Sequence, residues 1–264
     1  MNNKVIISLL NGFFYKLLIR YSIYLISVLP FIYSLVNCNS ILSIGLTILI
    51  IPAIIVMITG VLIFFHPDIN RTIIQPFSLN YYYWLNKNFL HEIILSSQFL
   101  NNTVNRIELI KIVYYNLCGL TNTLSTIIAP NVLILDPYKL ELGRNVFIGY
   151  NTLISGHIIE NKNLILKSVV ISDNVRIGAA CYISAGVIIG ENTQIGFNVR
   201  INSNCVIGKN VIIASETRID ESAVIEDNVY IGKNCIIGRK SIIQENAVLK
   251  PCEVIPNRAT VITE

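Results

Sequence analysis

The stretch VVISDNVRIGAACYISAGVIIGENTQIG, Val169–Gly196, repeats one short pattern every six residues. Aliphatic side chains occupy the repeating position from Ile165 through Val261, and a second, smaller residue follows four positions after each. Glu253 is the one clear exception at this second position. A period of six fits neither an amphipathic helix nor the alternation of a long strand, so each unit must contain a short strand and a turn.

The turns of this repeat carry residues that tolerate tight backbone geometry. Glycine follows the repeating aliphatic residue at positions such as Gly178 and Gly190, and asparagine recurs in turns such as IGKNV and IEDNV. Stacked units would hide the aliphatic side chains in one column and bond their backbones to the units above and below. Upstream, small insertions separate five further aliphatic positions, Ile128, Ile134, Leu142, Ile148 and Ile154. The repeat therefore predicts a β-solenoid over residues 127–264.

The N-terminal quarter has a different character. The chain is 53% hydrophobic and 14% charged, with a net charge of +4 and a mean hydropathy of +0.60. Ile41–Phe65 is an uncharged run longer than the roughly 20 residues that a membrane-crossing helix needs. A shorter uncharged run, Tyr21–Asn37, precedes it and contains Pro30. We expect a two-helix transmembrane hairpin within residues 1–66, with a re-entrant or interfacial first segment as the alternative.

Charged and aromatic residues orient this expected hairpin. Three basic residues precede the first run and residues 1–66 contain no acidic residue, so the positive-inside rule places the N-terminus in the cytoplasm. The aromatic stretch QPFSLNYYYWLNKNFLHEIIL, within residues 67–126, predicts juxtamembrane helices. The expectation is a multi-pass inner-membrane protein with membrane lipid as a partner, whose domain of residues 127–264 faces the cytoplasm.

Two stretches of the repeat, IGKNCIIGRKSI (Ile231–Ile242) and the segment Val169–Gly196, resemble the hexapeptide-repeat transferases. The resemblance covers residues 127–264 and, with the expected anchor, points to a membrane-anchored subgroup. It implies a left-handed parallel β-helix with three hexads per coil. It also implies an acyltransferase, most simply an acetyltransferase, that uses acetyl-CoA or another acyl-CoA as co-substrate. A homotrimer that modifies a glycan or lipid-linked acceptor in polysaccharide biosynthesis is the further expectation.

One break in the six-residue register carries the candidate chemistry. In ISGHIIENKNL, Ile154–Leu164, one residue is missing from the count, and His157 lies inside the break as the only histidine of the repeat. The resemblance implies a catalytic histidine in such an irregularity, and an imidazole suits a general base that activates a hydroxyl or amine. Either Asp136 or Glu160 could orient its ring. The alternative is that His157 faces solvent and both carboxylates are ordinary loop residues.

The resemblance also implies a course for the co-substrate. In these relatives the pantetheine arm of coenzyme A runs along the helix axis between two subunits and bonds to backbone groups in the turns. The corresponding turn positions are Ala179, Phe197 and Ser215, which lie in three successive coils. Phe197 departs from the small residue that is usual there, and its ring could pack against the apolar arm.

Other functions are excluded or left open by the same residues. No basic block marks a nucleic-acid surface, and neither G-x-G-x-x-G nor a P-loop precedes the repeat, as a nucleotidyltransferase would need. A metal site of the carbonic-anhydrase type needs about three histidines, and the repeat contains only His157, so we expect no metal. The six cysteines form no CxxC pairs, which favours free thiols. A non-catalytic membrane scaffold, and aminoacyl or peptidyl transfer as in poly-amino-acid synthetase modules, remain as alternatives.

Overall fold

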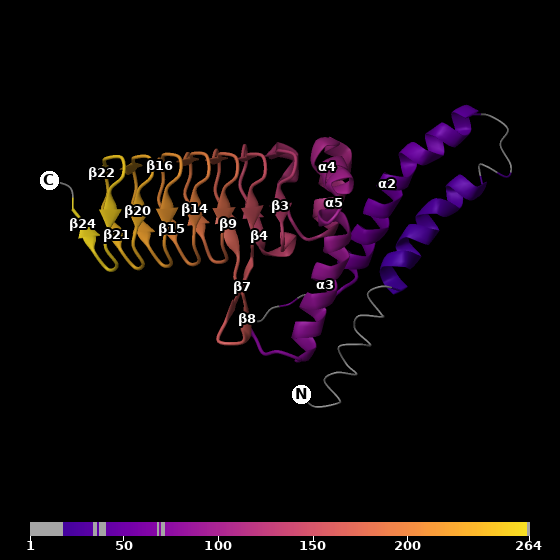
Figure 1. Cartoon of the computed structure of the whole chain (residues 1–264), viewed down its shortest axis with the longest axis horizontal. Helices are drawn as coiled ribbons and strands as arrows, with labels where there is room; N and C mark the ends of the chain where they lie inside the picture. Colours follow the sequence, from indigo (N-terminus) through magenta and orange to yellow (C-terminus); the bar gives the residue numbers. More distant parts are fainter. Residues whose placement is uncertain (1–17, 34–35, 37–40, 68, 70–71, 263–264) are drawn as a thin grey trace.

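The computed structural model describes residues 18–33, 36, 41–67, 69 and 72–262. Its dominant feature is a straight prism of stacked coils that begins near residue 127 (Figure 1). Three parallel seven-stranded sheets form the sides of this prism, and the strands of each sheet come from successive coils. The predicted left-handed parallel β-helix is confirmed.

Each side of the prism takes one short strand from every coil. Face 1 consists of β2 (Ile127–Ile128), β5 (Phe147–Ile148), β10 (Arg176–Ile177), β13 (Gln194–Ile195), β16 (Ile212–Ile213), β19 (Tyr230–Ile231) and β22 (Val248–Leu249). Face 2 consists of β3 (Leu133–Ile134), β6 (Leu153–Ile154), β11 (Tyr182–Ile183), β14 (Arg200–Ile201), β17 (Arg218–Ile219), β20 (Ile236–Ile237) and β23 (Val254–Ile255). Face 3 consists of β4 (Leu140–Leu142), β9 (Val169–Ile171), β12 (Ile188–Ile189), β15 (Val206–Ile207), β18 (Val224–Ile225), β21 (Ile242–Ile243) and β24 (Thr260–Val261). The turns that follow each face form corners 1–2, 2–3 and 3–1.

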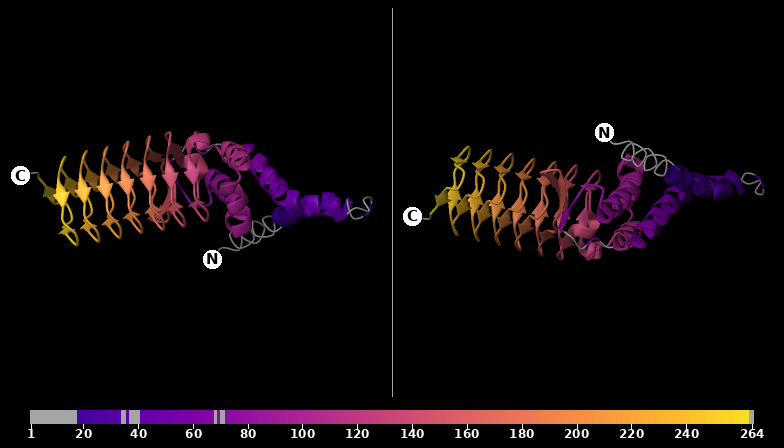
Figure 2. Two further views of the ribbon diagram at one scale, coloured as in Figure 1. Left: turned by 90° about the horizontal axis from the view of Figure 1, so that it is seen from above. Right: turned by 90° about the horizontal axis from the view of Figure 1, so that it is seen from below.

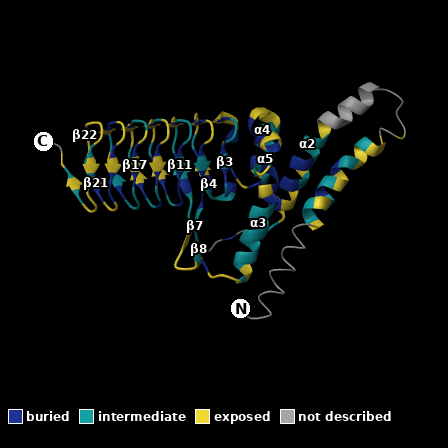
Figure 3. Cartoon of the chain, viewed as in Figure 1, coloured by how far each residue is buried: buried dark blue, intermediate teal, exposed yellow. Residues whose placement is uncertain are grey.

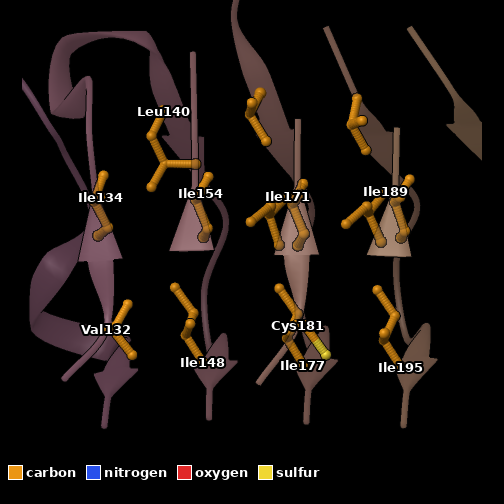
Figure 4. Close-up of a cluster of buried hydrophobic side chains, with 14 of the residues drawn as sticks. Val132, Ile134, Leu140, Ile148, Ile154, Ile171, Ile177, Cys181, Ile189 and Ile195 are labelled. Carbon is orange, nitrogen blue, oxygen red and sulfur yellow. The ribbon is translucent and has the colours of Figure 1, made fainter. Parts of the chain in front are cut away.

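The six-residue register determines what lies inside the prism. Ile177 pairs with Ile195 of the next coil, so equivalent positions stack along face 1. The repeating aliphatic residues and the smaller residues four positions later form a continuous buried column (Figure 4). Ile165 is an exception, because it lies in a hairpin strand and pairs with Ile158 instead of entering the column. The unbroken register therefore begins at Ile171, six residues later than the sequence suggests.

Glycine and asparagine serve different purposes in the turns. Asn192 and Asn210 have positive φ angles of 60° and 55°, and the Asn192 amide donates to the Asn210 side chain at 3.2 Å. Gly178 does not have a positive φ, but a Cβ atom there would lie 2.5 Å from the carbonyl oxygen of Gly196 in the next coil. Asparagine therefore provides the left-handed backbone conformation, while glycine permits the close approach of successive coils.

Helices between residues 79 and 117 close the N-terminal end of the prism (Figure 2). They are α3 (Leu79–Leu95), α4 (Gln98–Arg106) and α5 (Glu108–Leu117), and the short 3-10 helix η1 (Thr123–Ser125) leads from them into the first coil. The edge of a first coil presents unpaired backbone groups that must find partners. Side chains of the helices donate to its carbonyl groups: His91 to Ile134 at 2.7 Å, Asn101 to Val132 at 3.1 Å and Lys111 to Thr126 at 2.6 Å. The helices expected within residues 67–126 form a cap on the β-helix, and their buried apolar side chains belong to the same core as the first coils.

Helix α2 (Ile41–Phe64) packs against this cap. Ile55, Val56 and Ile63 are buried, and Gly60 allows a close approach to Leu117, whose Cδ1 would lie 3.0 Å from a Cβ atom at that position. Residues 18–33 form a further helix, which contacts the cap through a hydrogen bond of 2.8 Å from Arg20 to Ser96. The outward faces of both helices keep large apolar side chains exposed (Figure 3).

The predicted transmembrane hairpin is not found. Within the described ranges, no helix is both long enough and apolar enough to cross a bilayer. The hairpin and the multi-pass inner-membrane localisation derived from it are therefore wrong. An uncharged run can also form a helix that packs against protein along one side, as α2 does through Ile55, Val56 and Ile63 against α3 and α5. The opening stretch Val5–Arg20, which mixes apolar and basic residues and predicts an interfacial helix, lies mostly outside the described residues, as do residues 34–35 and 37–40, where the first uncharged run ends.

The break in the register is a β-hairpin that projects from corner 2–3. Strand β7 (His157–Glu160) pairs antiparallel with β8 (Asn163–Leu166), and β1 (Ile73–Ile74) adds a third strand beside β8. Asn161 and Lys162 form the two-residue turn with φ angles of 48° and 66°, as the favoured hairpin turns require. A small separate core anchors the hairpin; it contains Ile69, Ile74, Leu164 and Leu166 under Tyr81, Tyr83 and Trp84.

Candidate active site

His157 lies at the base of β7, where the hairpin leaves corner 2–3. Its side chain is 20% exposed. Ser155 holds the backbone at this point, because its Oγ donates to the His157 carbonyl at 2.8 Å and accepts from the His157 N–H at 3.3 Å. Both hydrogen bonds depend on the turn that starts the hairpin. The interruption of the repeat therefore fixes the position of the imidazole.

The imidazole is paired with Asp136, which lies one coil earlier. Nδ1 of His157 is 2.5 Å from Oδ2 of Asp136, and the Asp136 side chain is fully buried. Asp136 begins the insertion that contains the 3-10 helix η2 (Pro137–Lys139), between faces 2 and 3. Because an ionised carboxylate only accepts hydrogen bonds, Nδ1 carries the hydrogen and Nε2 of a neutral ring is left as the proton acceptor.

Four further donors hold the Asp136 carboxylate. The Gly156 N–H donates to Oδ2 at 3.1 Å, Trp84 Nε1 and Asn88 Nδ2 donate to Oδ1 at 3.1 and 3.3 Å, and the Tyr138 hydroxyl reaches Oδ1 at 3.5 Å. Burial raises the pKa of this carboxyl, but the hydrogen bond and charge of His157, with the hydrogen bonds of Asn88 and Trp84, hold the pKa below its usual value. Asp136 is therefore a buried carboxylate that stays ionised and can stabilise a protonated imidazole.

The catalytic residues predicted from the sequence do not include Trp84 or Asn88. Trp84 also packs edge-to-face on His157, with ring centroids 5.1 Å apart and an interplanar angle of 73°. An interfacial interpretation of the aromatic stretch around Trp84 gives no reason to connect it with the repeat. The available signal is spacing, because Trp84, Asn88 and His91 fall at i, i+4 and i+7 on one face of a helix.

A polar groove of about 680 Å³ opens beside His157. Ile158 and Ile159 of the hairpin form one wall, and the groove follows corner 2–3 along the later coils. Its polar lining consists of Ser155, Ser184, Asn202, Ser203, Glu160, Glu221 and Arg239. Arg239 pairs with Glu221 at 3.1 Å on the later coils. Hydroxyl, amide and charged groups in one groove suit a ligand that is itself rich in hydrogen-bonding groups.

Glu160 does not orient the imidazole. It lies at the exposed far end of β7, opposite Asn163 in the hairpin. Within the described part of the chain, Asp136 is the only carboxylate bonded to His157. Of the two carboxylates that the sequence offers as partners, the structure therefore brings Asp136 to the ring and leaves Glu160 on the wall of the groove.

Ala179, Phe197 and Ser215 stack on corner 1–2 in three successive coils. Ser215 Oγ accepts from the Phe197 N–H at 3.2 Å, and Phe197 is 52% exposed. Ser215 lines a second groove of about 670 Å³, which runs along face 1 between apolar side chains such as Phe147 and Ile212. This corner is not the one that carries His157, and the two grooves share no lining residue.

Other reactive side chains are buried or dispersed. Cys181, Cys205 and Cys235 are free thiols in the buried column, as their inward positions predict, and Cys118 is a buried free thiol beneath the cap. Burial raises the pKa of Cys118 and of Cys205 to about 12, so neither is a ready nucleophile. Among the residues that the structure places, no three His, Cys, Asp or Glu side chains are grouped as a metal ion would require.

Two protein families match the repeat. The family described as "GMPPB C-terminal domain" matches residues 128–220, and the family "Bacterial transferase hexapeptide (six repeats)" matches residues 216–251. These matches confirm a hexapeptide repeat of the kind found in transferases, and they give no support to a membrane-anchored subgroup. No curated protein matches the chain.

Several solved structures are similar to part of the chain. They include a mutant of perosamine N-acetyltransferase from Caulobacter crescentus in complex with CoA and GDP-perosamine, at 13% identity and a TM-score of 0.31 over 53% of this chain and 49% of that one. The UDP-N-acetylglucosamine acyltransferase of Arabidopsis matches at 17% identity and a TM-score of 0.33, over 48% and 64%. The corresponding Bacteroides fragilis enzyme matches at 21% and 0.28, over 50% and 56%. The chain thus spans about half to somewhat under two thirds of these proteins, and at such scores the similarity does not identify its reaction.

Proposed function

We propose that the protein is an acyl-CoA-dependent acyltransferase in which His157 is the general base. The observation that carries this proposal is the hydrogen bond of 2.5 Å between His157 Nδ1 and the fully buried carboxylate of Asp136. It directs the basic lone pair of Nε2 away from Asp136, and His157 lines the polar groove. The transferase family match over residues 216–251 and the resemblance of the repeat support the same class of reaction.

The pair has the chemical properties that acyl transfer needs. Nε2 of His157 takes the proton from an acceptor hydroxyl or amine as the acceptor oxygen or nitrogen attacks the thioester carbonyl. Asp136 remains ionised and stabilises the imidazolium that forms. When the tetrahedral intermediate collapses, the carbon–sulfur bond breaks and Nε2–H returns the proton to the departing thiolate of coenzyme A. The Gly156 N–H already donates to Asp136, so other donors must stabilise the oxyanion.

The two grooves have the chemistry of two different substrates. The groove beside His157 is lined by hydroxyl, amide and charged side chains, which suits a glycan acceptor. The groove on face 1 is largely apolar and reaches Ser215, which suits the pantetheine arm at Ala179, Phe197 and Ser215. Because the grooves lie on different corners, a second copy would have to present its corner 1–2 to His157. This arrangement is the proposed homotrimer with shared sites.

The full-length protein provides the test. Calorimetry with acetyl-CoA should show binding, and incubation with acetyl-CoA and a panel of oligosaccharides and sugar nucleotides should release free coenzyme A thiol together with an acetylated product. His157→Ala should bind acetyl-CoA normally and lose transfer. A folded protein that binds no acyl-CoA would favour the scaffold alternative, and full transfer by His157→Ala would remove the proposed mechanism.

A further inference from the structure

Helix α3 presents one face to the coil segment that carries Asp136. Trp84 and Asn88 donate to Oδ1 of Asp136, and His91, further along the same face, donates to the carbonyl of Ile134 at 2.7 Å. Trp84 and Asn88 both lie more than forty residues before Asp136 in the sequence. The cap therefore contacts the candidate site as well as the end of the prism.

The two oxygens of Asp136 have separate sets of partners. Oδ2 accepts from His157 and from the Gly156 N–H, both at corner 2–3. Oδ1 accepts from Trp84 and Asn88 of α3 at 3.1 and 3.3 Å and, at 3.5 Å, from the hydroxyl of Tyr138 in η2. Because Asp136 is only 1% exposed, solvent cannot replace a donor that is removed. The orientation of the carboxylate toward His157 thus depends on α3.

Trp84 contacts both members of the pair. Its indole N–H bonds to Asp136, while its ring packs against the imidazole of His157 at a centroid distance of 5.1 Å. The same ring covers the small core beneath the hairpin, which includes Leu164 and Leu166. A single side chain therefore joins the cap, the hairpin and the pair.

We infer that Trp84 and Asn88 are positioning residues of the His157–Asp136 pair, so that helix α3 is part of the catalytic centre. This inference rests on the proposed acyltransferase function, but its geometric content does not. With the two shortest hydrogen bonds to Oδ1 coming from α3, the carboxylate keeps Oδ2 in line with Nδ1–H and selects the tautomer with a free Nε2. Loss of either donor leaves Oδ1 with one α3 donor and the longer contact to Tyr138, so the carboxylate is held less firmly and the selection of tautomer weakens.

The variants Trp84→Phe and Asn88→Leu test this inference in the full-length protein. Each removes one donor to Oδ1 while keeping a side chain of similar shape and apolar contact. Tyr81→Phe is the matched control, because Tyr81 lies on the same helix and contacts Trp84 at a ring distance of 5.9 Å. The other ionisable groups near Asp136, namely Lys87 and His91 of α3 and Tyr138 of η2, stay unchanged in all three variants.

The first measurement does not depend on activity. The chain has three histidines, so ¹⁵N spectra of histidine-labelled protein can be assigned with His157→Ala as the reference. In the wild type and in Tyr81→Phe, His157 should be held as the Nδ1–H tautomer at a pH where the ring is neutral. Trp84→Phe and Asn88→Leu should show a mixture of both tautomers. A pure Nδ1–H tautomer in both variants would overturn the inference.

The second measurement separates positioning from folding. Both variants should lower kcat for acyl transfer by about tenfold, while KM for acyl-CoA stays within about twofold. Unchanged kcat in both variants of an active enzyme would contradict a positioning role. If the wild-type protein transfers no acyl group but the tautomer mixture appears as expected, the proposed reaction fails while the positioning of the pair by α3 stands.

Discussion

His157 and Asp136 are 21 residues apart in the sequence, yet their Nδ1 and Oδ2 atoms lie 2.5 Å from each other. The coil geometry explains this contact. Leu133 pairs with Leu153 and Ile134 with Ile154, so residues about one coil apart meet on face 2 and at the corner that follows it. Both residues lie just beyond this paired strand, in the insertions that leave corner 2–3. The two irregularities of the repeat therefore converge on one point.

Asp136→Asn tests the pairing directly. The amide can turn its NH₂ group toward Nδ1, which stabilises the ring with hydrogen on Nε2, and that form cannot accept the acceptor proton. We expect kcat to fall by roughly 10² to 10⁴, with little change in KM for acyl-CoA. Release of coenzyme A thiol measures the rate. Glu141→Gln is the matched control, because Glu141 is an exposed carboxylate on β4 that lines neither groove, and it should keep nearly full kcat.

His91 should make the stability of the protein sensitive to mild acid. Its ring is buried between Tyr114 and the Ile134 carbonyl, and burial lowers its pKa from 6.5 to about 4. Between these values the unfolded chain binds a proton at this histidine and the folded protein does not. The contribution is therefore fully present above about pH 6.5 and is lost as the pH falls toward 4, amounting to about 3 kcal/mol.

Urea unfolding at pH 7 and pH 4.5 measures this contribution. His91→Gln keeps an amide that can donate to the Ile134 carbonyl but removes the titrating group. The variant should lose most of the difference in unfolding free energy between the two pH values that the wild type shows. An equally large difference in His91→Gln would assign the acid sensitivity to other groups.

Because successive coils approach closely, adding a methyl group at Gly190 should destabilise the protein. A Cβ atom there would lie 2.5 Å from the carbonyl carbon of Gly208 in the next coil, and Gly190 itself lines neither groove. Gly190→Ala should lower the free energy of unfolding by about 1–3 kcal/mol. Gln244→Ala, at the same corner position in a later coil, should change it by less than about 0.5 kcal/mol. Equal effects of the two changes, measured by urea unfolding, would show that coil spacing adapts freely.

The regular part of the fold is predictable because its physics is periodic. Each position such as Ile177 has the same environment as its equivalents in other coils, so the six-residue spacing alone identifies the buried column. The same reasoning fails at Ile165, which matches the period although it belongs to the hairpin. A strand of the hairpin and a strand of a coil both bury alternate residues, and spacing cannot tell them apart.

The rest of the site depends on contacts that no period encodes. His157 is visible as a histidine inside a break, but the choice between Asp136 and Glu160 requires the path of two insertions. Trp84 and Asn88 meet Asp136 only because the cap folds onto the first coil. The uncharged run of α2 illustrates the same limit, since hydropathy measures apolar character and not whether protein or lipid covers it.

The assignment of the co-substrate to corner 1–2 predicts how two bulky substitutions should differ. Ala179→Tyr adds a side chain at corner 1–2, next to the groove of face 1, whereas Asn202→Tyr narrows the polar groove beside His157. Ala179→Tyr should raise KM for acyl-CoA by about tenfold or more and leave KM for the acceptor nearly unchanged; Asn202→Tyr should do the reverse. Initial-rate kinetics with each substrate varied in turn measures both constants. If Asn202→Tyr instead raises KM for acyl-CoA, the thioester arm lies along corner 2–3, within the same chain as His157, and a second copy is not needed to complete the site.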